Sequence, residues 1–387
     1  MHRRDFIRLM GTGATVAAAA GLSGCGTPNA AVTPWRDAGA PHADIRRTLL
    51  SWAVLAPNPH NLQPWLIDLR DPGELLLHVD RERLLPRTDP FGRQILIGHG
   101  CFLELLAMAA THHGLRARIE AFPTGAPSSE ALDDRPVARV RLEAAPGIAP
   151  DPLFAHTRAR RSNKEPYDTT RPLQPEVADA IARAALPDDR WASAAGVSGA
   201  STVAPASVEA LRSLTWRAHE REATTPATHM ESVRLMRIGR AEIERHRDGI
   251  SLSGPMIEVG RRLGMIDREA LADPNSKAFG AGMDRYRALA SSAMGFAWLS
   301  TRGDARVAQL AAGRAYLRMN LQTTALGVAM HPWSQALQEY PEMDPLRREA
   351  IERLAPGDGR TVQMLVRLGY GPTVAPKPRR DPQALLR

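Results

Sequence analysis

The sequence predicts an α+β fold, in which helices and strands are mixed without steady alternation. Three observations support this. Apolar residues recur at helical spacing over two long segments, about 94–113 and 304–326, and a glycine follows each segment where a helix should end. Short runs typical of strands lie between them. The run 362–368 is apolar on both faces, which is expected of a strand in the interior of a covered sheet.

The first half contains two predicted helices and four predicted strands. In chain order these are helix 44–55, strands 65–69 and 75–79, helix 94–113, and strands 119–122 and 137–142. Asp71-Pro72-Gly73 is a turn signal between the first two strands. The stretch 144–152 is rich in Pro and Ala and is the best internal boundary.

The second half repeats this outline with additional helices. Its predicted elements are helix 175–185, a largely helical stretch 205–290 interrupted at 249–254 and 273–282, strand 296–299, helix 304–326, a strand near Val328, helix 345–354 and strand 362–368. Pro175 suits the first turn of its helix.

The first 25 residues are typical of an export signal and are excluded from the fold. Arg3-Arg4-Asp5-Phe6 is a twin-arginine pattern, and Leu22-Ser23-Gly24-Cys25 resembles a lipoprotein cleavage box. We therefore expect export by the twin-arginine route to the periplasm or cell envelope, with a lipid on Cys25 as the only membrane attachment. Residues 26–42, rich in Ala, Pro, Thr and Gly, are predicted to be a flexible tether.

Charge and cysteine content exclude several classes of protein. The net charge is +8, but the basic residues are interspersed with acids, which indicates solvated helix faces and no nucleic-acid partner. Only Cys101 remains beside Cys25, within an apolar helical run, so it is expected to be buried. A metal site built from His99, His112 or His113 is not expected, because adjacent histidines at a helix end rarely converge on one ion.

The stretch Ala56–Trp65 is predicted to be a rigid polar loop between a helix and a strand. Three prolines exclude helix, and its asparagines favour side-chain-to-backbone turns. Such a loop can present backbone groups and an amide side chain to a flat heterocycle without rearranging. Taken alone, the loop is better explained as a plain turn between the helix and the strand.

Two basic runs in the second half are suited to a phosphate group. Arg160-Arg161-Ser162-Asn163-Lys164 places cations and a hydroxyl on one short segment, and Pro376-Lys377-Pro378-Arg379-Arg380 lies near the C-terminus. Only three of the fifty basic residues are lysine, and two of these, Lys164 and Lys377, fall in the two runs. Each run alone is typical of a solvated corner or a disordered tail.

Together these motifs resemble the nitroreductase family of FMN flavoproteins, in its Acg-like branch. The Pro-x-x-x-Asn-x-Gln-Pro-Trp loop is similar to the family's flavin-contacting loop, and the two basic runs are similar to its phosphate-binding segments. His331-Pro332-Trp333-Ser334-Gln335 resembles the segment beside the flavin N5, although Pro332-Trp333 alone would indicate core packing. The cofactor contacts that the resemblance implies are Pro57, Asn58, Asn61, Gln63, Arg160, Ser162, Lys164, Ser334, Gln335, Lys377 and Arg379.

The distribution of the motifs implies two fused nitroreductase-like units, each a mainly antiparallel sheet packed with helices. The units would span residues 43–146 and 150–380, the second with a helical insertion at 205–290 that could cover the flavin. The Asn-x-Gln-Pro-Trp loop occurs only in the first unit and the phosphate runs only in the second; residues 186–191, where a second loop would fall, read differently. This predicts an intramolecular pseudo-dimer, a monomer in solution, with one FMN.

The resemblance implies an FMN-dependent oxidoreductase that reduces a flat organic acceptor of nitroaromatic or quinone type. Because the flavin carries the chemistry, no catalytic acid or base is assigned. The electron donor is unknown, since the chain has no Gly-x-Gly-x-x-Gly fingerprint and an exported enzyme has no obvious NAD(P)H supply. A flavin-sequestering envelope protein with little turnover is the alternative.

Overall fold

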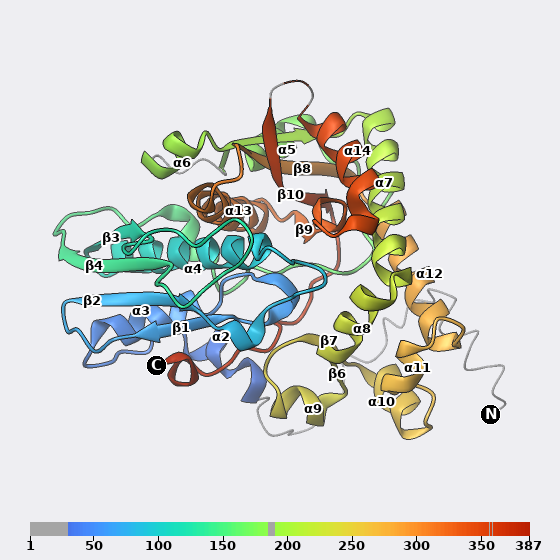
Figure 1. The fold of residues 1–387 in the computed structure, drawn as a ribbon, viewed down its shortest axis with the longest axis horizontal. Coiled ribbons are helices and arrows are strands. Elements are labelled where there is room, and N and C mark those ends of the chain that lie inside the picture. Colours follow the sequence, from blue (N-terminus) through green and yellow to red (C-terminus); the bar gives the residue numbers. More distant parts are fainter. Residues whose placement is uncertain (1–29, 185–189, 356, 358) are drawn as a thin grey trace.

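The computed structural model describes residues 30–184, 190–355, 357 and 359–387, which form an α+β fold with two four-stranded sheets (Figure 1). The fold class predicted from the sequence is therefore confirmed. The predicted export signal, residues 26–29 and residues 186–189 lie outside the described residues.

The first sheet is antiparallel with strand order β1-β2-β4-β3. Its elements are α3 (Ile45–Ala53), β1 (Trp65–Asp68), β2 (Glu74–Val79), α4 (Arg93–His112), β3 (Leu115–Ala121) and β4 (Ala138–Ala144). The Asp44 carboxylate accepts a hydrogen bond from the backbone N–H of Arg46, which caps α3. The sequence predicted all six elements, with β3 beginning four residues before the predicted position.

The second sheet is also antiparallel, with strand order β5-β8-β10-β9. Its elements are α5 (Pro175–Ala184), α6 (Arg190–Ala195), β5 (Ser198–Thr202), β8 (Gly295–Arg302), α13 (Arg306–Ala325), β9 (Ala329–Pro332), α14 (Asp344–Leu354) and β10 (Arg360–Gly369). β10 lies inside the sheet, between β8 and β9, as its two apolar faces predicted. β5 was not predicted.

The two sheets share one topology. Among the four strands of each sheet, the first in sequence pairs only with the second, the second pairs with the fourth, and the third lies at the far edge. In each, a long helix (α4 or α13) follows the second strand and leads directly to the third. The connection between the first two strands differs: it is a short turn in the first unit and an insertion of almost 100 residues in the second.

The insertion is largely helical, as predicted. It contains α7 (Pro205–Thr224), α8 (Pro226–Leu235), β6 (Met236–Ile238), α9 (Arg240–Arg245), β7 (Ile250–Leu252), α10 (Pro255–Arg262), α11 (Arg268–Ala272) and α12 (Lys277–Ser291). The predicted break at 273–282 is too long, because α12 already begins at Lys277. The Ser276 hydroxyl accepts from the N–H of Phe279 and caps this helix despite its glycines. β6 and β7 form a small parallel pair that was not predicted.

The long helices α4 and α13 pack against each other at the centre of the molecule (Figure 1). They meet at Gly100 and Gly313, where an added Cβ on either glycine would overlap backbone atoms of the other helix. Nearby, the buried Glu104 of α4 pairs with Arg314 and Arg318 of α13 at 2.7 and 2.9 Å. Among the described residues, α4 alone has the length and composition of a membrane span, and most of it is buried in this interface and core.

The predicted flexible tether is wrong for residues 30–38. A 3₁₀ turn (Ala30–Val32) leads into α2 (Thr33–Asp37), and the segment packs on the protein: Ala31 is 0%, Trp35 6% and Ala38 1% exposed. The composition of the segment is that of a linker, but burial of the large Trp35 side chain stabilises its packing on the protein.

The C-terminal segment crosses from the second unit to the first (Figure 1). After β10 it passes the loop at 57–65, and its last residue donates a backbone hydrogen bond to the Ile67 carbonyl of β1 at 2.9 Å. Pro378, Arg379 and Leu385 are buried, so the segment is fastened to the protein at these points, while much of the rest of it is exposed. A disordered tail, the plainer interpretation of its Lys-Pro-Arg-Arg sequence, is excluded.

Candidate functional site

The loop at 57–65 contains no α-helix, as the sequence predicted, although Pro59–Asn61 form a short 3₁₀ turn. His60, Asn61 and Gln63 all adopt positive φ angles, between 49° and 55°, which side-chain-bearing residues adopt only when their surroundings hold them there. One restraint is the Asn58 side chain, whose oxygen accepts from the Gln63 N–H at 2.8 Å. Trp65 then anchors the loop in the core at 0% exposure.

Two of the polar side chains in this loop bind the C-terminal tail. The Asn61 side-chain oxygen accepts from Arg379 Nη1 at 2.6 Å, and its amide donates to the Pro378 carbonyl at 3.0 Å. The Gln63 side-chain oxygen accepts from the Arg380 N–H at 2.8 Å, and its amide donates to the Arg247 carbonyl of the insertion at 2.8 Å. The loop, the tail and the insertion therefore meet at one place.

The Asn58 and Gln63 side chains, which the sequence predicted as cofactor contacts, are bonded within the protein. Gln63 is fully buried, and both ends of its amide are bonded within the protein. The Asn58 amide braces its own loop, with its nitrogen donating to the Ala56 carbonyl at 3.2 Å. These side chains shape the loop, whereas the neighbouring His60 is half-buried and Pro57 is buried.

Arg160 of the first basic run lies between the two units. Its guanidinium donates to Asn320 Oδ1 of α13 at 2.7 Å and to the Leu55 carbonyl of the first unit at 2.8 Å. It is 2% exposed, and burial lowers its pKa to about 10. Its Nε is buried without a hydrogen-bond partner. In the same run, Ser162 is half-buried and Lys164 is exposed.

Arg379 of the tail lies in the same region. It is 4% exposed, its Nε is also buried without a partner, and its Nη2 donates to the Leu55 and Ala56 carbonyls at 3.2 Å. Burial, and then the charges of Arg160 and Arg161, hold its pKa well below the ordinary value. Arg160, Arg161 and Arg379 therefore lie close together. Within the described part of the chain, no carboxylate forms an ion pair with any of these three arginines. They form a cluster of uncompensated positive charge.

The lysines of the two runs lie close enough to influence each other. Loss of hydration, and then the positive charge of Lys164, lower the pKa of Lys377. The charge of Lys164 also acts on residues of other segments. Burial first and Lys164 second lower the pKa of His60 to about 4 and that of His219 in α7 to about 3. Lys164 is therefore close to both the first-unit loop and the insertion.

Ser334 and Gln335 follow Trp333 in the second unit and have different surroundings. The Ser334 hydroxyl donates to the Leu365 carbonyl at 3.1 Å and accepts from the Leu365 N–H at 3.0 Å, so it fastens this segment to β10. Gln335 is half-buried, and its side-chain oxygen has no hydrogen-bond partner among the described residues.

The insertion adds residues that sequence reasoning missed. The His219 ring stacks on Tyr286 of α12, with centroids 3.9 Å apart and planes at 16°, and Trp333 meets this pair edge-on at 6.3 and 6.1 Å. The buried His219 Nδ1 and Trp333 Nε1 have no partner in the described structure. An isolated histidine in a helix of mixed composition offers no sequence signal, because its significance comes from contacts with residues far along the chain.

Glu222 lies one turn after His219 on α7. It is 8% exposed and accepts a hydrogen bond from Gln338 Nε2 at 2.9 Å. Burial raises the pKa of its carboxyl to about 7. This group is therefore partly protonated near neutral pH, beside the aromatic cluster.

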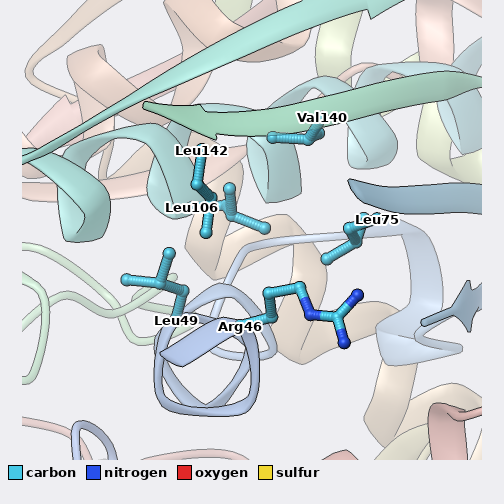
Figure 2. Close-up of a pocket in the computed structure, with 6 residues that line it drawn as sticks. All are labelled: Arg46, Leu49, Leu75, Leu106, Val140 and Leu142. Carbon is cyan, nitrogen blue, oxygen red and sulfur yellow. The ribbon is translucent and has the colours of Figure 1, made fainter. Parts of the chain in front are cut away.

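Metal clusters and pockets elsewhere in the described residues were compared with this region. The described residues contain no group of three His, Cys, Asp or Glu side chains that could hold a metal ion. The pocket in Figure 2 lies in the first unit, and aliphatic side chains with the stem of Arg46 form its walls. None of the predicted cofactor contacts lines it.

Comparison with known proteins gives similarity over most of the chain. The chain is 27% identical over 373 residues to the provisionally named NAD(P)H nitroreductase Rv3131 of Mycobacterium tuberculosis, covering 90% of this chain and 94% of that protein. It is 35% identical over 80 residues to another protein of that organism with the same kind of name, acg, covering 21% of this chain and 24% of that one. No protein-family model matches the chain.

Solved structures include distant matches. One is a nitroreductase with bound FMN from Bacteroides fragilis, at 16% identity and a TM-score of 0.34, covering 60% of this chain and 94% of that one. Another is the FMN-dependent nitroreductase NfnB of Mycobacterium smegmatis in complex with NADPH, at 17% identity and a TM-score of 0.36, covering 59% and 93%.

Proposed function

We propose that this chain is an FMN-dependent oxidoreductase of the nitroreductase type. The observation that carries the proposal is the convergence of three segments remote in sequence: the loop at 57–65, the run at 160–164 and the tail at 376–380. The near full-length similarity to a protein named as an NAD(P)H nitroreductase supports it.

The residues of the site fit a phosphate-bearing cofactor. A buried cluster of arginines without carboxylates is unfavourable unless an anion compensates it. The unpartnered Nε groups of Arg160 and Arg379 are donors that such an anion would satisfy. Lys164, Lys377 and the Ser162 hydroxyl would complete the phosphate site, with Pro57 and Gln335 toward the ring. Asn61, whose amide is bonded to the tail at both ends, would hold Arg379 in place.

The bound FMN would supply the electron-transfer chemistry. The residues of the chain would hold its phosphate, fix the loop against which it lies and exclude water through the insertion. The aromatic cluster of His219, Tyr286 and Trp333 would lie beside a planar acceptor such as a nitroaromatic or a quinone.

The repeated strand order supports an origin by fusion of two nitroreductase-like units, with the chain acting as its own pseudo-dimer. In this arrangement the first unit contributes the loop and the second contributes the phosphate-binding runs. One cofactor site per chain follows, and a second copy of the chain would not be needed to complete it.

Export and lipid attachment are further proposals from the N-terminal sequence. Replacing Arg3 and Arg4 together by lysine should retain the protein in the cytoplasm. Replacing Cys25 by serine should release it from the membrane fraction without preventing export. Cell fractionation of both variants tests these expectations separately.

The absorbance spectrum of the purified full-length protein tests the cofactor and its use. A flavin spectrum that bleaches promptly with NAD(P)H under anaerobic conditions supports a reductase. The alternative, flavin sequestration, is favoured by contacts that bring the insertion over the loop, such as the Gly249 N–H donating to the Asn61 carbonyl at 3.2 Å. A flavin spectrum that remains unchanged with NAD(P)H and with electron donors other than dithionite would support sequestration. A protein that binds no flavin would contradict both.

A further inference from the structure

The N-terminal segment 30–38 forms part of the arginine cluster. Three guanidinium groups lie over the ring of Trp35: Arg161 at 4.7 Å, Arg379 at 5.1 Å and Arg160 at 5.5 Å from its centroid. The Trp35 indole N–H donates to the Lys377 carbonyl at 2.8 Å. One tryptophan therefore contacts both basic runs.

A second contact fixes the tail to the same segment. The Arg379 N–H donates to the Ala31 carbonyl at 2.8 Å, 348 residues away in the chain. The segment thus holds the backbone of the tail on both sides of Pro378, through Lys377 and Arg379.

The indole ring is a favourable electrostatic partner that all three arginines of this cluster share, in addition to their hydrogen bonds to oxygen acceptors. Like charges in a buried place repel, and burial with mutual repulsion already lowers the pKa of Arg379. The face of an aromatic ring carries partial negative charge, and its attraction for cations is strongest where water is excluded. Trp35 is 6% exposed, so this contact is shielded.

We propose that Trp35 is a positioning residue for the phosphate of the cofactor, so that residues 30–38 form a third component of the site. This inference rests on the proposed function. Trp35 lies outside both repeated units and would act through the arginines: the ring fixes the planes of their guanidinium groups, and the N–H fixes the tail that carries Lys377. The unpartnered Nε groups of Arg160 and Arg379 would then be presented to the phosphate.

Comparison of FMN with riboflavin tests this inference, because riboflavin lacks the phosphate. Affinities for both would be measured on the flavin-free full chain by quenching of flavin fluorescence. Trp35→Leu should weaken FMN binding about tenfold, equal to about 1.4 kcal/mol, and change riboflavin binding less than twofold. Trp35→Phe keeps the ring face and loses the N–H, so it should retain FMN affinity within about threefold.

Trp52→Leu is a matched control. Trp52 also contacts a guanidinium, that of Arg158 at 4.9 Å, but none of the three arginines of the cluster. It should not alter the preference for FMN over riboflavin. If Trp35→Leu fails to fold, Trp35→Met provides the same comparison with a more adaptable side chain.

The outcomes separate the inference from the proposed function. A wild-type protein that binds riboflavin as tightly as FMN would contradict the phosphate site itself. A wild type that prefers FMN, with Trp35→Leu losing both ligands equally or neither, would overturn the role of Trp35 alone. Loss of FMN affinity in Trp35→Phe equal to that in Trp35→Leu would assign the effect to the N–H and contradict the contribution of the ring.

Discussion

Single residues of the site are best tested through the lysines, because the chain has only three. Lys164→Ala should weaken FMN binding roughly tenfold to a hundredfold, since a charge-assisted contact to phosphate is lost. Riboflavin binding should change far less. Lys277→Ala is the matched control, because Lys277 is exposed at the start of α12 and should leave both affinities unchanged. Equal losses for both flavins would place Lys164 away from the phosphate.

The carboxyl of Glu222 makes stability depend on pH. Its folded pKa is about 7 against an ordinary value of 4.5. Below about pH 4.5 the group is protonated in both states. As pH rises to 7, only the unfolded chain loses the proton, so the free energy of unfolding falls, by up to about 3 kcal/mol for this group, and stays lower above pH 7.

Glu222→Gln should remove this dependence, so the variant should gain stability relative to wild type between pH 4.5 and pH 8. Urea denaturation at both pH values measures the free energy of unfolding of the variant and of wild type. Glu220→Gln on the same helix is the control and should leave the wild-type profile unchanged. A Glu222→Gln profile parallel to wild type would mean that the folded protein holds this carboxyl ionised.

Sequence pointed to residues that the structure brings together, but it did not predict the partner of each side chain. Arg160, Lys164, Lys377 and Arg379 stood out as cations in two short runs, and all four belong to the region where the loop and tail meet. Gln63 and Ser334 were predicted as ligand contacts, yet their polar atoms bond to backbone groups. An amide or hydroxyl suits either partner equally well, so residue type alone could not decide between them.

At the scale of elements, the crossing of α4 and α13 is the most sensitive contact between the units. Gly313→Ala should destabilise the protein by roughly 1–3 kcal/mol or more, because the added Cβ overlaps the Ile97 carbonyl and backbone must move to accommodate it. Gly280→Ala is the control: it lies within α12 with open space around its Cα, so it should be neutral or stabilising by up to about 1 kcal/mol. Chemical denaturation measures both, and an unaffected Gly313→Ala would show that the helices can separate freely.

Elements with strong periodicity were predicted well, and those held by small residues were not. The helices 94–113 and 304–326 came within two residues of α4 and α13 at each end. β5, with the sequence Ser-Gly-Ala-Ser-Thr, lacks any strand pattern. It pairs with β8 along its whole length, and Gly199 leaves room for the carbonyl of Ala182 in α5 to lie against it. Such a strand is specified by its neighbour, and its own composition gives no indication.

The whole molecule should bind one FMN per chain and behave as a monomer. Flavin released by denaturation, quantified against protein, tests the stoichiometry, and light scattering tests the mass. Two flavins per chain, or a flavin carrying an adenylate group, would contradict the single site.

The division of the site between units also predicts that neither fragment suffices alone. Residues 30–146 and 150–387, expressed together as separate chains, should associate through α4 and α13 and recover flavin binding. The first fragment must begin at residue 30, because Trp35 packs on the basic runs of the second. The fragment 150–387 alone should bind FMN weakly. Tight binding of FMN by this fragment alone would mean that the loop at 57–65 is only a turn and does not contribute to the site.

The packing of residues 30–38 limits how an anchored molecule could move. If Cys25 carries a lipid, five peptide steps join the bilayer surface to Ala30, a leash of at most about 18 Å when fully extended. A folded chain of this size has a radius of gyration of about 20 Å. The connecting segment is shorter than the radius of the folded protein, so the protein could not rotate freely above the membrane. The face that carries Trp35 would stay turned toward the lipid headgroups, and a flavin or acceptor would have to reach the protein from its other sides.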